Sequence, residues 1–191
     1  MPVVERVGAE QALERVTEVV GNLASEIKPV FGHVDITCAP KDLVELVTKL
    51  RDADDIQCRF FTFLSGVDRS EFGLEEGAGG DGSPRPPQLE VLIHLYSPSR
   101  VLHATIHVPL EGEEPVCPSI SSVFRGALWH ERETHEMFGI DFDGHPGLLN
   151  LYLPEDFAGH PLRRSFRLPS RAVKSWPGAK DPGEAAAGGR G

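Results

Sequence analysis

Residues 89–108, with the sequence LEVLIHLYSPSRVLHATIHV, decide the fold. Apolar residues alternate with other residues in 89–96 and again in 101–108, which is the period of a strand with one buried face. The inward positions are Leu89, Val91, Ile93, Leu95, Leu102, Ala104, Ile106 and Val108. Residues 97–100, Ser-Pro-Ser-Arg, form a turn signal between the two runs. The stretch predicts two antiparallel strands joined by a tight turn.

Two further strands are expected upstream of this hairpin. Residues 33–38 alternate Val34, Ile36 and Cys38 inward, and residues 56–65 are rich in β-formers. Residues 73–88, GLEEGAGGDGSPRPPQ, are Gly- and Pro-rich with almost no apolar content. Such a segment offsets little of its ordering entropy, so we expect a flexible loop that links neighbouring strands.

Three segments carry helical periodicity. Apolar residues recur at helical spacing in 9–27, where Lys28-Pro29 ends the pattern, and in a helix that starts at Pro40. A third helix is expected over 119–138, stopped by Gly139. Its apolar face includes Glu131, and burying a carboxylate without a partner costs several kcal/mol. Glu131 therefore meets an arginine or a backbone donor, or that part of the face is solvated.

These elements predict an α+β fold, with an α/β-type layered domain. About four strands form a mixed, largely antiparallel sheet packed against helices, and a long extended C-terminal tail follows. The globular domain is expected over 1–139. Residues 140–191 contain six Pro and eight Gly, too many for an independent core. We expect this segment to wrap over a partner, with its last residues disordered.

Charge and cysteine content narrow the class of protein. The net charge of −10 argues against nucleic acid as a partner. Residues 160–191 carry a net charge of +5, so the remaining residues carry −15, and such a basic tail suggests a binding partner of its own. The absence of a long apolar run or signal-peptide pattern predicts a cytoplasmic protein. Three widely spaced cysteines predict buried free thiols.

A metal site is a weaker interpretation. His130, Glu131 and His135 resemble an HExxH motif, but the second histidine comes one residue late. Five residues correspond to about 140° in helical projection, so the two imidazoles do not easily share one ion. His103 and His107 lie on one face of a strand and form a second candidate pair, or are two exposed sheet histidines. A soluble metal-dependent hydrolase using residues 130–160 is the alternative that this density of His and Glu leaves open.

Other catalytic patterns are missing from the sequence. The acidic residues of 131–143 could support acid–base chemistry or form a solvated or partner-docking surface. The sequence contains no GxSxG nucleophile motif and no GxGxxG or GxxxxGK[ST] nucleotide motif. Two Gly-His-Pro sequences, at 144–146 and 159–161, predict rigid corners that present an imidazole, for a structural or a docking purpose.

The sequences Glu131-Arg132-Glu133, residues 137–140 (MFGI), residues 144–146 (GHP) and residues 159–163 (GHPLR) resemble the signature of one family. This family is the thirty-kilodalton subunit of bacterial NADH–quinone oxidoreductase, respiratory complex I. The resemblance covers about residues 8–182. The sequence departs from the family pattern at His135-Glu136, at residues 147–150 and at Ser165.

The resemblance implies a subunit without catalytic, cofactor-binding or metal-binding residues. It implies a place in the peripheral arm, at the cytoplasmic face of the membrane, against the large subunit that helps form the quinone site. The assembly is expected to use NADH, FMN, iron–sulfur clusters and quinone. The expected partner-docking residues are Arg132, Glu133, Phe138, His145, His160, Pro161, Leu162 and Arg163. The equivalent subunit of a membrane-bound hydrogenase stays open as an alternative.

Overall fold

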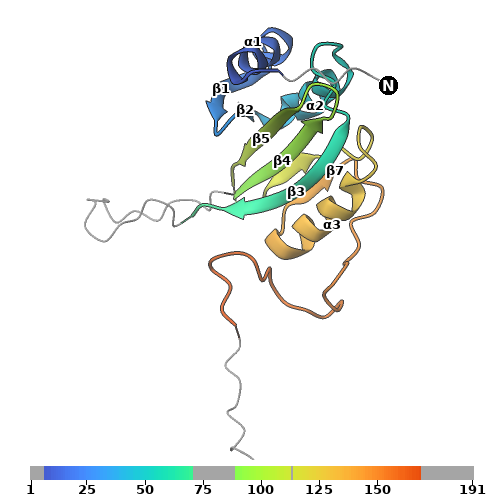
Figure 1. Cartoon of the computed structure of the whole chain (residues 1–191). Helices are drawn as coiled ribbons and strands as arrows, with labels where there is room; N and C mark the ends of the chain where they lie inside the picture. The colour runs from blue at the N-terminus through green and yellow to red at the C-terminus, as the bar shows by residue number, and fades with distance from the viewer. Residues whose placement is uncertain (1–6, 71–88, 113, 169–191) are drawn as a thin grey trace, which may run out of the picture.

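The computed structural model of the chain describes residues 7–70, 89–112 and 114–168. In this part of the chain, five strands form a sheet in the order β1-β2-β5-β4-β3 (Figure 1). Their bounds are Ala24–Val30 (β1), His33–Cys38 (β2), Phe60–Asp68 (β3), Leu89–Ser97 (β4) and Leu102–Leu110 (β5). The β2–β5 pair is parallel and the other neighbouring pairs are antiparallel. The predicted α+β class and the hairpin of residues 89–108 are confirmed, with β1 as an additional strand.

The helices pack on one face of this sheet. They are α1 (Ala9–Val20), the short 3₁₀ helix η1 (Pro40–Asp42), α2 (Leu43–Asp52) and α3 (Ala127–Phe138). Val34, Ile36, Ile93, Ala104 and Ile106 are fully or almost fully buried and lie on the covered face. They share one hydrophobic core with apolar residues of α1 and α2. No helix among the described residues is long and apolar enough to cross a membrane.

The first predicted helix is too long at its C-terminal end. Helix α1 stops at Val20, followed by Gly21, and Ile27 lies in β1 opposite Ile36 of β2. Pairing with β2 satisfies the backbone of residues 24–30, so tertiary pairing overrides the helical spacing of the apolar residues. Figure 1 shows β1 as an edge strand beside β2.

The third predicted helix is too long at its N-terminal end. Helix α3 begins at Ala127, and residues 119–126 form turns. The Ser121 backbone N–H donates to Ser119 Oγ (3.2 Å), and the two hydroxyl groups lie 2.6 Å apart. Such local side-chain hydrogen bonds compete with helix formation.

A small parallel pair of strands links this region to the residues after α3. Strand β6 (Val116–Pro118) pairs with β7 (Asp141–Asp143). Ile140 and Phe142 are buried in the main core, so packed structure continues past the predicted boundary at residue 139. Strands this short have no readable periodicity in the sequence.

The strand expected at 56–65 is shifted, because β3 spans Phe60–Asp68 while Ile56 and Cys58 are buried in the turn after α2. Strands β3 and β4 are antiparallel neighbours, as expected for strands linked by the Gly- and Pro-rich segment. That segment and the predicted disordered end of the tail lie outside the described residues. All three cysteines lie in the described part of the chain, where they are buried and free of disulfide bonds.

Gly66 of β3 is the contact point for α3. A Cβ atom at this position would lie 2.6 Å from the ring of Phe138, which packs over the glycine. Gly66→Ala should therefore lower the free energy of unfolding by about 1–3 kcal/mol, although alanine normally stabilises a strand relative to glycine. Denaturant unfolding measures the loss. Gly147→Ala is the matched control, since a Cβ there has no neighbour within 4 Å, and equal losses in both variants would contradict this packing.

Candidate functional site

The second Gly-His-Pro sequence caps the C-terminus of α3. Four donors reach its last carbonyl groups, which have no partner within the helix. They are His160 Nδ1 to Glu136 O (2.9 Å), Leu162 N to Met137 O (3.1 Å), Arg163 Nε to Phe138 O and Arg163 Nη2 to Gly139 O (3.2 Å). The cationic Arg163 also lies at the negative end of the helix dipole. The sequence GHPLR therefore completes the helix of its own chain.

Gly139 makes this cap possible. Its backbone is left-handed, with φ of 67°, and its N–H donates to His135 O. A Cβ atom at this position would lie 2.4 Å from His160 Nε2 and 2.8 Å from Arg163 Nη2. Glycine is required both by the backbone conformation and by the close approach of the capping residues.

Glu136 holds the middle of the C-terminal segment. Its carboxylate accepts backbone N–H groups from Leu151 (3.2 Å), Tyr152 (3.0 Å) and Leu153. Burial raises the pKa of Glu136, but the backbone donors and the nearby Arg132 outweigh this and hold the pKa below its ordinary value. The carboxylate therefore stays ionised and binds three consecutive amides.

Arg132, one helical turn before Glu136 on α3, binds the backbone just before these amides. Its Nε donates to Leu149 O and its Nη2 to Asn150 O, each at 2.8 Å. The guanidinium carbon lies 5.1 Å from the centre of the Trp129 ring, a cation–π distance. Arg132 and Glu136 together fix the backbone of residues 149–153 against the helix.

Glu131 connects α3 to the segments on either side of it. The side chain is fully buried and accepts Ser119 Oγ (2.6 Å) and the Ile120 N–H (2.8 Å). The backbone-donor alternative is therefore the correct one. Burial raises the pKa of Glu131, while Ser119, the Ile120 amide and His145 oppose this.

His145, in the first Gly-His-Pro sequence, lies beside this carboxylate. Its Nε2 is 4.0 Å from the Glu131 carboxylate and its side chain is 1% exposed. The Gly147 N–H donates to His145 Nδ1 (2.9 Å), so Nε2 is the protonated nitrogen and donates to Leu128 O (3.2 Å). This corner anchors the start of the C-terminal segment on α3.

The structure brings together most of the predicted docking residues, within one chain. Arg132, His145, His160 and Arg163 hold residues 144–168 on α3, and Phe138 (7% exposed) packs in the core against Gly66. Glu133 and Pro161 are half-buried, while Leu162 is 54% exposed. Their role towards another protein stays a prediction.

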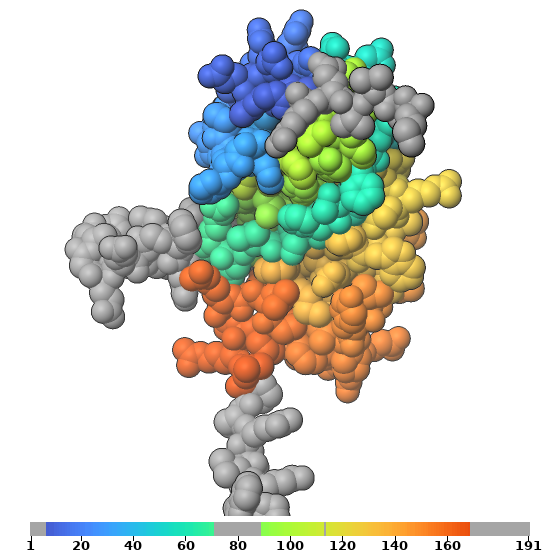
Figure 2. Space-filling model, in the orientation of Figure 1, coloured from blue at the N-terminus to red at the C-terminus, as the bar shows by residue number. Residues whose placement is uncertain are grey.

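Several large apolar side chains of residues 144–168 are exposed. In the described part of the chain, five of the nine exposed large hydrophobic residues belong to this segment: Leu149, Tyr152, Phe157, Leu162 and Leu168. Figure 2 shows residues 144–168, in orange, as one end of the body next to α3. An apolar surface of this kind is typical of a protein–protein contact.

The histidines of 130–160 do not converge on one ion. His130 Nδ1 lies 3.2 Å from Leu64 O, His135 Nδ1 lies 3.1 Å from Ile140 O, and His145 and His160 bond two other carbonyl groups. His103 and His107, the candidate pair on the sheet, do not share a site either. His107 contacts Glu90 and Asp35, whereas His103 contacts His94. Neither candidate metal pair from the sequence is assembled.

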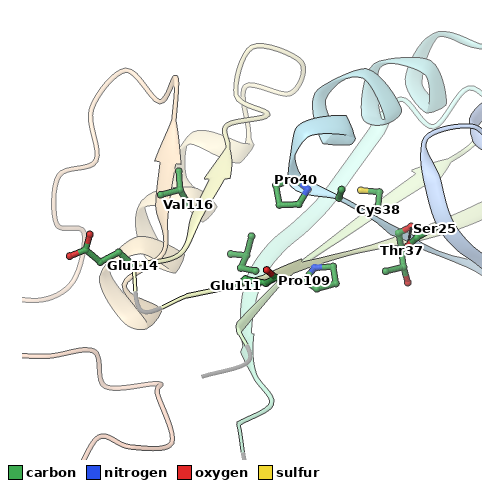
Figure 3. Close-up of a pocket in the computed structure, with 10 residues that line it drawn as sticks. Ser25, Thr37, Cys38, Pro40, Pro109, Glu111, Glu114 and Val116 are labelled. Carbon is green, nitrogen blue, oxygen red and sulfur yellow. Dashed lines mark hydrogen bonds between the residues drawn. The ribbon is translucent and has the colours of Figure 1, made fainter. Parts of the chain in front are cut away.

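A surface pocket of about 520 Å³ lies between the C-terminal ends of β2 and β5 on one side and β6 on the other. Figure 3 shows Thr37, Cys38 and Pro40 on one side and Val116 on the other. Burial, with a smaller contribution from Asp42, raises the pKa of Cys38 to about 12. The thiol is therefore protonated at neutral pH and is not an activated nucleophile.

Two residues of this site were not singled out from the sequence. In the sequence, Glu136 is one of several acids and part of the His135-Glu136 departure from the family pattern, and Ser119 falls inside the predicted helix. Helical projection separates Glu131 from Glu136 by about 140°, which indicates two different partners. The identity of those partners, backbone amides of residues 120 and 151–153, has no signal in side-chain patterns.

Comparison with known proteins identifies relatives of the chain. A family model described as the respiratory-chain NADH dehydrogenase 30 Kd subunit matches residues 36–172. An NADH-quinone oxidoreductase subunit of Rhizobium rhizogenes is 36% identical over 150 residues, 78% of this chain and 68% of the relative. The same-named protein of Mesorhizobium japonicum is 37% identical over 138 residues, 72% of this chain and 62% of the relative. That of Herpetosiphon aurantiacus is 35% identical over 137 residues, 72% of each chain.

Two solved structures share the fold. The trypsin-resistant fragment (1–134) of Nqo5 aligns with a TM-score of 0.51 and 20% identity, covering 71% of this chain and 98% of the fragment. A chain of the membrane-bound sulfane sulfur reductase, an archaeal respiratory membrane complex, aligns with a TM-score of 0.57 and 15% identity, covering 81% and 85%.

Removal of the Glu131 carboxylate should destabilise the body. Glu131→Ala leaves the Ser119 hydroxyl and the Ile120 N–H without their acceptor, which should cost about 1–3 kcal/mol in the free energy of unfolding. Glu131→Gln keeps one acceptor oxygen and should lose less. Denaturant unfolding measures both, with Glu133→Ala as the control on the same helix. A loss for Glu133→Ala as large as that for Glu131→Ala would contradict the analysis.

Acid should release the C-terminal segment from α3. The pKa of Glu136 lies below its ordinary value of about 4.3, so its contribution is present above that pH and is lost as the pH falls through the folded-state pKa. Hydrogen exchange at the amides of 151–153 should accelerate on acidification, after correction for intrinsic rates. Glu136→Gln should give the faster exchange already at pH 7. Unchanged protection of these amides in Glu136→Gln would contradict the assignment of Glu136 as their acceptor.

Proposed function

Because the chain belongs to the family of the respiratory-chain NADH dehydrogenase 30 Kd subunit, we propose that it is a peripheral-arm subunit of a proton-translocating NADH–quinone oxidoreductase. In this proposal the chain is non-catalytic and binds no cofactor. Electrons pass from NADH through FMN and iron–sulfur centres to quinone in other subunits. The role of this chain is to dock to the large subunit at the quinone site, at the cytoplasmic face of the membrane.

The observation that carries the docking role is the arrangement of residues 144–168. Their backbone groups bond inward to Arg132, Glu136 and the end of α3. Five of their large apolar side chains are exposed. A segment held in this way presents a preorganised apolar surface, which reduces the entropy that a partner must offset on binding. An obligate interface of this kind commonly buries about 2,000–5,000 Å².

The positive charge of the C-terminal segment indicates which kind of partner surface it would face. Arg163 and Arg164 lie in the described end of the segment, and the sequence from 160 to 191 is basic on an otherwise acidic chain. Arg163 is engaged with carbonyl groups of α3, and Arg164 is exposed beside Asp68, which accepts its backbone N–H. We expect carboxylates on the large subunit to face this end of the chain.

Affinity purification of the full chain from gently solubilised native membranes tests the proposal. Co-purification of a large quinone-site subunit with flavin and iron–sulfur subunits is the expected result. Recovery of a nickel–iron large subunit instead would move the chain to the hydrogenase-type complex. Recovery of the chain alone, with hydrolase activity, would overturn the subunit role.

Substitution at the exposed surface should separate docking from folding. Leu162→Asp places a charge on a side chain that is 54% exposed, so assembly should weaken by more than about tenfold while the melting temperature of the isolated chain changes little. Phe31→Asp is the matched control, because Phe31 is fully exposed at the β1–β2 turn, away from α3. Blue-native electrophoresis with quantitative mass spectrometry gives the assembled fraction. Equal recovery of the two variants would refute docking through this segment.

A further inference from the structure

Three histidines from three neighbouring strands meet on the sheet face opposite the hydrophobic core. They are His33 on β2, His94 on β4 and His103 on β5, and one ligand nitrogen from each lies within 4.8 Å of the others. The register explains the meeting. Val34 pairs with Ala104, which sets His33 beside His103, and Tyr96 pairs with His103, which sets His94 diagonally across from it.

We propose that His33, His94 and His103 form a binding site for a divalent transition-metal ion such as Zn²⁺. His94 Nε2 and His103 Nδ1 are 3.2 Å apart. Two nitrogens at about 2.0–2.1 Å from a tetrahedral ion are separated by about 3.3–3.4 Å, so this pair already has ligand spacing. His33 has a ligand nitrogen within 4.8 Å of the other two and completes the set when its ring leaves the stack on His103. The site goes beyond the proposed docking function and uses none of its residues.

Aromatic neighbours hold His94 and His103 in place. Tyr96 lies 4.4 Å from His103, and Phe63 stacks on His94 at 5.7 Å. A fixed ring orientation lowers the cost of assembling a ligand set. His94 and His103 are half-buried, so the site is partly shielded from water.

The protonation state also suits a metal. Burial, followed by the neighbouring histidines, lowers the pKa of His94 and His103, so the rings are neutral at pH 7. Neutral imidazole is the form that binds metal. The 3.2 Å contact between His94 Nε2 and His103 Nδ1 is a hydrogen bond, so one of these nitrogens gives up its proton when the ion binds. His94 Nδ1 has no hydrogen-bond partner among the described residues, so it can carry the ring proton and leave Nε2 for the ion.

The ligand set selects the class of ion. Imidazole nitrogens suit Zn²⁺, Cu²⁺ and Ni²⁺, whereas Mg²⁺ and Ca²⁺ require oxygen ligands. A surface hollow of about 430 Å³ is lined in part by His33 and His103. Three protein ligands leave one tetrahedral position for water. His107 lies on the same face but is held by Glu90 and Asp35, outside the set.

Zinc titration of the full chain, produced without a histidine tag and stripped with a chelator, tests the site. Calorimetry and elemental analysis should give about one Zn²⁺ per chain and no Mg²⁺. Changes in the second shell of a metal site alone cost about 10–100-fold in affinity, so His94→Asn and His103→Asn should each cost at least tenfold. His107→Gln, on the same face of β5, should retain the affinity of the unsubstituted chain.

Two outcomes would overturn the proposal: no zinc uptake by the unsubstituted chain, or uptake that survives both substitutions. Unfolding midpoints in chelator verify that the variants are folded. X-ray absorption of the zinc-loaded, unsubstituted chain gives a readout that depends on no variant. Three imidazoles near 2.0 Å are expected, and an ion bound by fewer than two would refute the site.

Discussion

The buried carboxylate of Glu131 is the constraint on which the C-terminal half of the structure depends. A carboxylate removed from water needs donors, and its donors come from residues 119 and 120, with His145 close by. These residues lie before and after α3 in the chain. Satisfying one side chain therefore fixes where α3 begins, how the chain reaches β7 and where the first Gly-His-Pro corner lies. The same contacts prevent residues 119–126 from extending the helix.

The rest of α3 applies the same principle to the segment that follows it. Glu136 binds backbone amides, Arg132 binds carbonyl groups, and the second Gly-His-Pro sequence returns to cap the helix. Residues 144–168 have no regular secondary structure beyond turns, so their polar backbone groups need partners from elsewhere. The helix supplies many of these, which explains how a Pro- and Gly-rich stretch is held without strands or helices of its own.

The sequence predicts elements whose side-chain pattern repeats, but it does not show contacts between side chains and the backbone. Alternation predicted β4 and β5, and the Pro40 signal predicted the start of the second helical segment. The helical spacing of apolar residues wrongly extends the first helix over residues 21–27. This stretch leads into β1, which forms by pairing with β2. Gly21 is the residue in the sequence that signals the end of the helix. The motifs of 131–163 contain residues that hold the C-terminal segment on α3, but these contacts within the chain cannot be read from the sequence. Side-chain patterns do not reveal which backbone amide a glutamate binds. The histidines of three strands meet only once the sheet register is known.

The motif residues of 131–163 make contacts within their own chain. Gly139 is required because His160 and Arg163 approach it, and Glu131, Arg132 and Glu136 are occupied by their own chain. These contacts define the path of the segment, whereas the exposed apolar side chains of the proposed docking surface are Leu149, Tyr152, Phe157 and Leu162, of which only Leu162 belongs to the motifs. The motifs therefore set the path of the segment, while the exposed side chains to which docking is assigned in the proposal lie mostly outside them. At Leu149, Tyr152 and Leu162 a backbone group bonds α3 while the apolar side chain of the same residue is exposed.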